Sequence, residues 1–163
     1  MAVTKWFKIE KGIGQTYQTQ MVVASGTTAS IDRGAPTKKS SGNAAIMVDG
    51  DGTTSQVFTG IAKSTSNETA SVAGTVQLWM PVPGIVYRGF AKSAAAADTQ
   101  GEIDALVGKR VVFDLTSTDW TVDTAAANAA TNCLIIVGGM PQTSEIMFSI
   151  ADSGTVFANV TTA

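Results

Sequence analysis

Short apolar segments separated by turn residues are the feature that most constrains how this chain can fold. The segments are rich in Val, Ile, Ala and Thr, and Gly, Pro, Asp or Ser interrupts the chain between them. Short strands with frequent turn signals are typical of β-barrels and β-sandwiches. We therefore predict an all-β fold, a small barrel or sandwich of short strands with one short helix near residues 99–107 and extended terminal arms.

Alternation of apolar and polar residues places the expected strands. They lie at residues 15–24, 44–48, 57–62, 75–80, 85–92, 111–115, 134–137, 145–150 and 155–160, with a further extended segment at 69–72. Residues 120–122 form either a short strand or a turn. Residues 26–42 are polar and broken by Gly and Pro, so a long loop is expected there. The run Asp49-Gly50-Asp51-Gly52 predicts a hairpin turn. Pro81-Val82-Pro83-Gly84 predicts either a hairpin or a corner between two strands.

One helix is indicated by its own end signals. Thr99 followed by Glu102 is a capping box, in which the hydroxyl and the carboxylate satisfy the first free amides of a helix. Gly108 is suited to end the helix in a left-handed conformation. The helix would present one apolar stripe of Ile103, Leu106 and Val107.

We divide the chain into an N-terminal arm (1–14), a barrel or sandwich body (15–155) and a C-terminal tail (156–163). The arm interleaves apolar and basic side chains, which is a pattern suited to contact with a partner. Trp6 either anchors on that partner or covers the core of its own domain. The predicted partner-contact residues are Lys5, Trp6, Phe7, Lys8 and Lys11.

Charge is unevenly distributed along the chain, although the net charge is only -2. Residues 1–39 hold six basic and two acidic side chains, whereas residues 111–163 hold five acidic side chains and no Lys or Arg. Either this is surface scatter, or a basic N-terminal region meets an acidic surface on a neighbouring copy or a host lattice. Nucleic-acid binding is disfavoured, because the basic residues form no dense patch interleaved with aromatics.

The residues needed for common catalytic chemistry are scarce. The chain has no His, so a Ser-His-Asp or Cys-His arrangement cannot form. Its one cysteine, Cys133, precedes an apolar run, which predicts a buried and inert thiol. Asp49-Gly50-Asp51-Gly52 resembles the start of a calcium loop, but Gly60 stands where the twelfth-position Glu belongs. We therefore expect no enzymatic activity, no cofactor and no metal site.

Targeting signals are likewise not expected. The first residues lack the apolar segment of a signal peptide, and no run of about 18 apolar residues occurs. We accordingly expect neither secretion nor a membrane partner, with synthesis in the cytoplasm.

A resemblance to a known class of proteins rests on three segments. They are Phe58–Lys63, Thr75–Lys92 and Asp98–Asp114, which include a G-I-A-x-S strand followed by a G-T-V-x-L-x-x-P strand. This pattern resembles the β-barrel head decoration, or cement, proteins of tailed bacteriophages. The resemblance covers roughly residues 55–140, and no functional position is carried over from it.

The resemblance implies a structural protein of the virion, located on the head surface. It would bind the lattice of the major capsid protein after expansion and hold capsomeres together, and it would associate with itself, with a trimer as the first expectation. Three alternatives remain at this stage: a tail-tube or other tail structural protein, a carbohydrate-binding β-sandwich module, and a hydrolase that uses two carboxylates.

Overall fold

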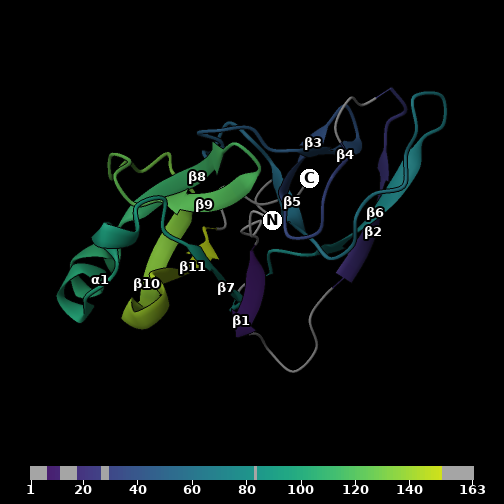
Figure 1. Ribbon diagram of the computed structural model, residues 1–163. Helices are drawn as coiled ribbons and strands as arrows, with labels where there is room; N and C mark the ends of the chain where they lie inside the picture. The colour runs from purple at the N-terminus through teal and green to yellow at the C-terminus, as the bar shows by residue number, and fades with distance from the viewer. Residues whose placement is uncertain (1–6, 12–17, 27–29, 83, 152–163) are drawn as a thin grey trace.

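Two β-structures that share one core make up the protein. The computed structural model describes residues 7–11, 18–26, 30–82 and 84–151. Within them lie a closed barrel in the order β2-β4-β3-β5-β6 and a six-stranded sheet in the order β1-β7-β11-β10-β8-β9. Figure 1 shows the barrel at one end of the molecule and the helix α1 at the other. The prediction of an all-β fold with a small barrel and one short helix is confirmed.

The order of the elements shows that the chain completes the barrel before it builds most of the sheet. The barrel strands are β2 (Gln18–Val23), β3 (Pro36–Ser40), β4 (Asn43–Ile46), β5 (Phe58–Ala62) and β6 (Gly74–Trp79). The sheet strands are β1 (Lys8–Lys11), β7 (Val86–Phe90), β8 (Arg110–Thr116), β9 (Asp119–Asp123), β10 (Leu134–Met140) and β11 (Glu145–Ile150). The helical segments are η1 (Ala94–Ala96), α1 (Gln100–Leu106) and η2 (Pro141–Thr143). Only β1 belongs to the sheet while preceding the barrel in sequence.

The connection between β6 and β7 is a corner rather than a hairpin. β6 pairs with β2 and β5 in the barrel, whereas β7 pairs with β1 and β11 in the sheet. Of the two alternatives for this segment, the hairpin is wrong and the corner is what forms. The buried Tyr87 hydroxyl donates a hydrogen bond to the carbonyl of Met80 (3.1 Å), which ties the two sides of the corner together.

The Asp49–Gly52 run forms a turn, but not the predicted hairpin. The amide of Asp51 donates to the carbonyl of Val48 (3.1 Å), which closes the turn. β4 and β5 on either side of it both pair with β3, and not with each other. The hairpin prediction failed because a turn signal reports the local backbone and not which strands pair.

The predicted loop at residues 26–42 contains the strand β3, so that prediction is wrong. β3 lies between β4 and β5 in the barrel. Its buried Thr37 side chain shares a 2.8 Å hydrogen bond with the Thr59 hydroxyl and donates to the Gly60 carbonyl. Because a threonine and two lysines occupy the middle of this strand, the sequence has no alternation of apolar and polar residues that would predict it.

Two further predicted segments were not found as strands in the described residues. The extended segment expected at 69–72 is a turn, since the amide of Thr69 donates to the carbonyl of Val72 (2.9 Å). The strand expected at 155–160 and the tail at 156–163 lie outside the described residues.

Residues 7–11 belong to the body, which corrects the predicted arm at 1–14. β1 pairs with β7 at the edge of the sheet. Phe7, which precedes β1, is 2% exposed, and a side chain at Gly89 would collide with its ring. A buried ring cannot reach a partner, so the prediction of Phe7 as a contact residue is also corrected.

The helix follows its predicted caps. The hydroxyl of Thr99 accepts from the amide of Glu102 (3.3 Å), and the Glu102 carboxylate accepts from the amide of Thr99 (3.1 Å). Gly108 has a φ of +84° and donates to the Ile136 carbonyl, which docks the helix end on β10. The predicted stripe is only partly right. Ile103 and Leu106 are buried, but Val107 is 49% exposed because its extended backbone turns it away from the helix.

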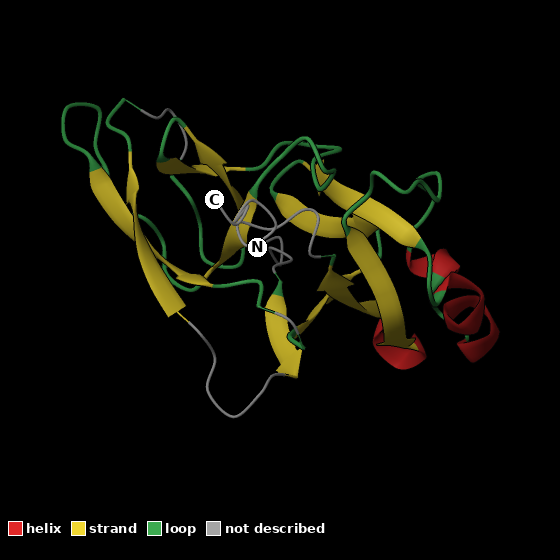
Figure 2. Ribbon diagram, turned by 180° about the vertical axis from the view of Figure 1, so that it is seen from behind, coloured by secondary structure: helices red, strands yellow, loops and turns green. Residues whose placement is uncertain are grey.

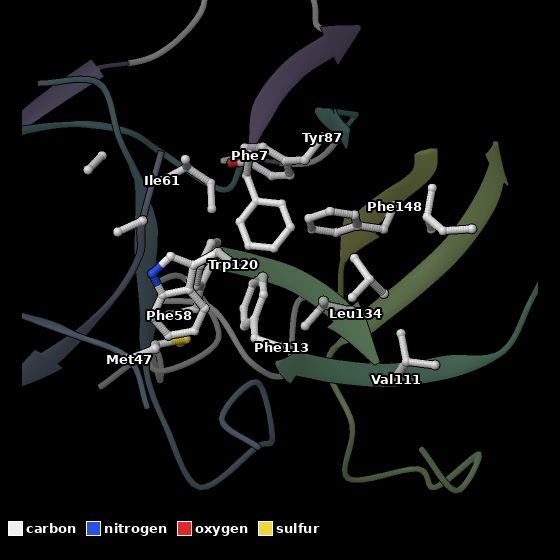
Figure 3. Close-up of a cluster of buried hydrophobic side chains, with 14 of the residues drawn as sticks. Phe7, Met47, Phe58, Ile61, Tyr87, Val111, Phe113, Trp120, Leu134 and Phe148 are labelled. Carbon is white, nitrogen blue, oxygen red and sulfur yellow. The ribbon is translucent and has the colours of Figure 1, made fainter. Parts of the chain in front are cut away.

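An aromatic cluster fills the junction between barrel and sheet (Figure 3). Phe58 on β5 stacks on Phe113 of β8, with ring centroids 5.7 Å apart. Phe7 packs against Phe113 (5.2 Å) and against Phe148 of β11 (5.3 Å). All five residues of β5 are buried, since one face of this strand lines the barrel and the other meets the sheet. The two β-structures therefore share one core.

Substituting Phe7→Ala tests whether this residue belongs to the core. We expect the free energy of unfolding to fall by about 3–5 kcal/mol, because the change removes a fully buried ring and leaves a cavity. Chemical denaturation measures this. The control Val107→Ala alters an exposed apolar residue and should change stability by no more than about 0.5 kcal/mol. If the two substitutions lower the free energy of unfolding equally, Phe7 belongs to a terminal arm and not to the core.

Candidate functional site

Three carboxylates with almost fully buried side chains hold the most concentrated polar chemistry of the described residues. The exposed fractions of the side chains are 7% for Asp51, 3% for Asp114 and 6% for Glu145. Each carboxylate forms an ion pair with at least one lysine or arginine. An unpaired buried carboxylate would be strongly destabilising, so these partners are a requirement of the fold.

Asp51 joins the barrel to the sheet. Its carboxylate accepts from Lys38 Nζ on β3 (2.6 Å) and from the amide of Val48 (2.8 Å). Its backbone carbonyl accepts from the amide of Phe113, and the amide of Gly50 donates to the carbonyl of Phe113. The turn at residues 49–51 is thus hydrogen-bonded on one side to β8 and on the other to β3.

Asp114 ties β8 to its neighbours. Its carboxylate lies 2.7 Å from Lys92 Nζ and accepts from the hydroxyls of Thr116 and Thr121, both at 2.9 Å. Burial alone raises the pKa of Asp114, but the hydrogen bonds from Lys92, Thr116 and Thr121 outweigh it, so the pKa lies below its ordinary value. The hydrogen bond to Asp114 and the charge of Asp123 raise the pKa of Lys92.

Glu145, on β11, connects this strand to β1 and β7. Its carboxylate lies 3.2 Å from Lys8 Nζ on β1 and 3.6 Å from Arg88 Nε on β7. The hydroxyl of Thr143 donates to the same carboxylate (2.9 Å). Since Lys8 comes from the basic end of the chain and Glu145 from the acidic end, part of the charge asymmetry is satisfied inside one molecule.

The arrangement of these groups suits a scaffold. Each buried carboxylate faces a cation and hydrogen-bond donors, which hold it as a charged acceptor and fix strands in place. Among the described residues, no group of three or more His, Cys, Asp or Glu side chains lies close enough to hold a metal ion. In the same part of the chain, no helix has the length and apolar character needed to cross a membrane.

The predicted contact residues are placed differently from one another. Lys8 has a side chain that is 49% exposed although it pairs with Glu145. Lys11 ends the edge strand β1, and Phe7 is in the core. Lys5 and Trp6 lie outside the described residues. The structure therefore brings Lys8 and Lys11 together on one strand.

Cys133 is buried, as its apolar neighbours predicted. Its side chain is 1% exposed, and burial raises the pKa of its thiol although the charge of Arg110 opposes this. A thiol whose pKa is raised is mostly protonated near neutral pH, which makes it a weak nucleophile.

Sequence reasoning missed the three ion-paired carboxylates. The partners are far apart in sequence, as Lys8 and Glu145 show, and only folding brings them together. A usable signal was present, because Asp114 lies between Phe113 and Leu115 in β8, and Glu145 begins β11 directly before Ile146. An acid in such a position requires a buried partner.

Comparisons with protein-family models, with curated proteins and with solved structures gave no match to this chain. Function is therefore argued from the residues, from their geometry and from the resemblance described above.

The pKa of Asp114 gives a testable dependence of stability on pH. Because its folded pKa is lowered, its stabilising contribution is present above the unfolded pKa of about 3.9 and is lost as the pH falls through the folded value. Asp114→Asn should be less stable than wild type by about 1–3 kcal/mol at pH 7. The difference should shrink between about pH 4 and pH 2.

Denaturation midpoints measured at pH 7, 5, 4, 3 and 2 check this expectation. The control is Asp104→Asn, which alters an exposed acid on α1 whose carboxylate accepts a hydrogen bond from the Gln100 side chain (2.7 Å). This variant should keep the wild-type pH profile. A constant stability difference for Asp114→Asn across the whole range would contradict the assignment.

Proposed function

We propose that the chain is a structural protein of a tailed-phage virion that decorates the head surface and holds neighbouring capsid subunits together. The observation that carries the proposal is the use made of the buried charges. Asp51, Asp114 and Glu145 are all engaged in joining strands and turns. A polar interior devoted to bracing suits a rigid binding module whose work is contact and not chemistry.

The segments that resemble head decoration proteins contribute elements to both the barrel and the sheet. Phe58–Lys63 contains β5, Thr75–Lys92 covers most of β6 and all of β7, and Asp98–Asp114 contains α1 and most of β8. These elements include the two strands whose rings stack across the junction. The resemblance thus concerns the part of the chain on which the shape of the molecule depends.

Binding would be additive over many copies. One copy buries a modest area against two or more capsid subunits, and interfaces of that size are individually weak or moderate. Each bound copy links subunits that would otherwise separate, so many copies together raise the barrier to rupture of the shell. No cofactor is part of this mechanism.

The basic N-terminal segment is the contact that we propose for an acidic area of the major capsid protein. Phe7 anchors this segment in the core, and the strand β1 that follows carries Lys8 with a half-exposed side chain. Lys5, Trp6 and Lys11 complete the proposed contact. Phe7 thereby acquires a positioning role in place of direct contact.

Co-sedimentation with heads of the parent phage tests the function. We expect saturable binding to expanded empty heads, weaker binding to unexpanded heads, and decorated heads that withstand higher temperature before rupture. Rings or tubes that form without heads would favour a tail structural protein instead. A failure to bind heads in either state would overturn the proposal.

Charge reversal tests the contact separately from the function. Lys5→Glu combined with Lys11→Glu should weaken binding to expanded heads by about tenfold at low salt, and less at high salt, because rim charges act through screened attraction. The control Lys109→Glu reverses one lysine just beyond the C-terminal end of α1, which is half the charge change, and should bind as wild type. If both variants bind equally well, decoration occurs through another surface.

A further inference from the structure

One strand of the barrel has an edge that is open along most of its length. β2 pairs with β6 at every residue from Gln18 to Val23. On its other side it pairs with β4 at one position, Val23 with Ala44. Within the described residues, the edge of β2 from position 18 to position 22 therefore has no neighbouring strand.

The six-stranded sheet has β1 and β9 at its two edges, and both strands have protective features that β2 lacks. β1 carries lysines and an irregular register between Ile9 and Lys11. β9 has an aspartate at each end, and Ala91 and Lys92 cover it through a bridge and a hydrogen bond at Val122. Charge, bulges and covering segments are the means by which natural strand edges avoid pairing with other chains.

The open edge of β2 is uncharged and contains no proline. Its sequence is Gln18-Thr19-Gln20-Met21-Val22, and Val22 is 50% exposed. Gln18, Gln20 and Val22 are the exposed residues of the alternation, and Thr19 and Met21 are half-buried. The β2–β6 ribbon lies at the end of the molecule opposite α1 in both views (Figures 1 and 2).

We propose that this edge binds the same edge of a second copy, with the two β2 strands antiparallel about a twofold axis. Residues that face each other in a sheet lie on the same side of it, so the axis must pass through a residue pair and not between two residues. An axis at Gln20 uses all five open positions. It pairs Gln20 with itself, Gln18 with Val22, and Thr19 with Met21.

The composition and charge of the ribbon favour a second copy as the occupant. Pairing β2 with itself brings no like charges into opposition, which would otherwise be unfavourable. Lys63 lies at the Gln18 end of the ribbon, where its Nζ donates to Gln18 Oε1 (2.8 Å). Lys63 is thus hydrogen-bonded within its own copy, at the end of the five paired positions and away from the axis at Gln20.

The size of the contact sets its strength. Five residues from each copy form an interface well below the standard size, so the dimer is weak and depends on concentration. The expected assembly is a dimer and not the trimer that the resemblance implies. This inference does not depend on the proposed function, because it concerns the purified protein alone.

A disulfide trap tests the axis directly. In Gln20→Cys, the two introduced thiols face each other across the twofold axis at the spacing of cross-strand neighbours. Mild oxidation at low micromolar concentration should give a covalent dimer of twice the 16.8 kDa chain mass on a non-reducing gel.

The matched control is Gln77→Cys. Gln77 is also exposed and lies directly opposite Gln20, but on β6, one strand away from the edge. This variant should remain mostly monomeric under the same oxidation. Equal cross-linking of the two variants, or no cross-linking of Gln20→Cys, would overturn the proposal. Both variants retain the buried Cys133, so its contribution cancels.

A second measurement uses charge in place of a covalent bond. Gln20→Lys places two lysines opposite each other at the axis and should raise the dimer dissociation constant about fivefold. Gln77→Lys should leave it unchanged. Light scattering over a concentration series reads out both. A wild-type mass of one chain at all concentrations, or a mass of three chains, would contradict the twofold pairing.

Discussion

The packing of β5 against the sheet is the contact on which the rest of the structure depends. A β-sheet must bury its apolar face against another element. β5 solves this because it lines the barrel with one face and offers the other, through Phe58, to Phe113. Phe7, just before β1, and Phe148 of β11 complete the cluster from the sheet side. Removing this contact would expose apolar surface on both halves at once.

The ion pairs form a second layer around that junction. Lys38 with Asp51 joins barrel to sheet, and Glu145 with Lys8 holds the first strand against the sheet. Buried ion pairs contribute little net stability after desolvation, yet breaking one is costly because a buried charge is left without a partner. Their value here lies in fixing which strands and turns lie together. Such bracing suits the proposed role of the chain as a binding module.

Local signals in the sequence could predict local structure. The helix was predictable because Thr99, Glu102 and Gly108 act within one or two turns of the chain. Strands such as β8 and β11 alternate clearly enough to be recognised. β3 was not predictable, because its second residue, Thr37, is a buried polar residue whose hydrogen-bond partner, Thr59, lies 22 positions away.

Long-range pairing limited the prediction of the candidate site in the same way. The mixture of aromatic and basic residues near the N-terminus was recognisable, but the place of Phe7 in the core depends on the space left by Gly89. The open edge of β2 could not be seen in the sequence either. It follows from β4 pairing with β2 at a single position, which is a property of the whole barrel.

Native-state hydrogen exchange tests most directly whether the barrel and the sheet form one cooperative unit. If they share one core, the slowest amides of β6 in the barrel and of β10 in the sheet exchange only through global unfolding. Their opening free energies then agree within about 1 kcal/mol and match the free energy from denaturation. If the amides of β6 open at a free energy lower by about 2 kcal/mol or more, the barrel unfolds separately and the junction is not the central contact.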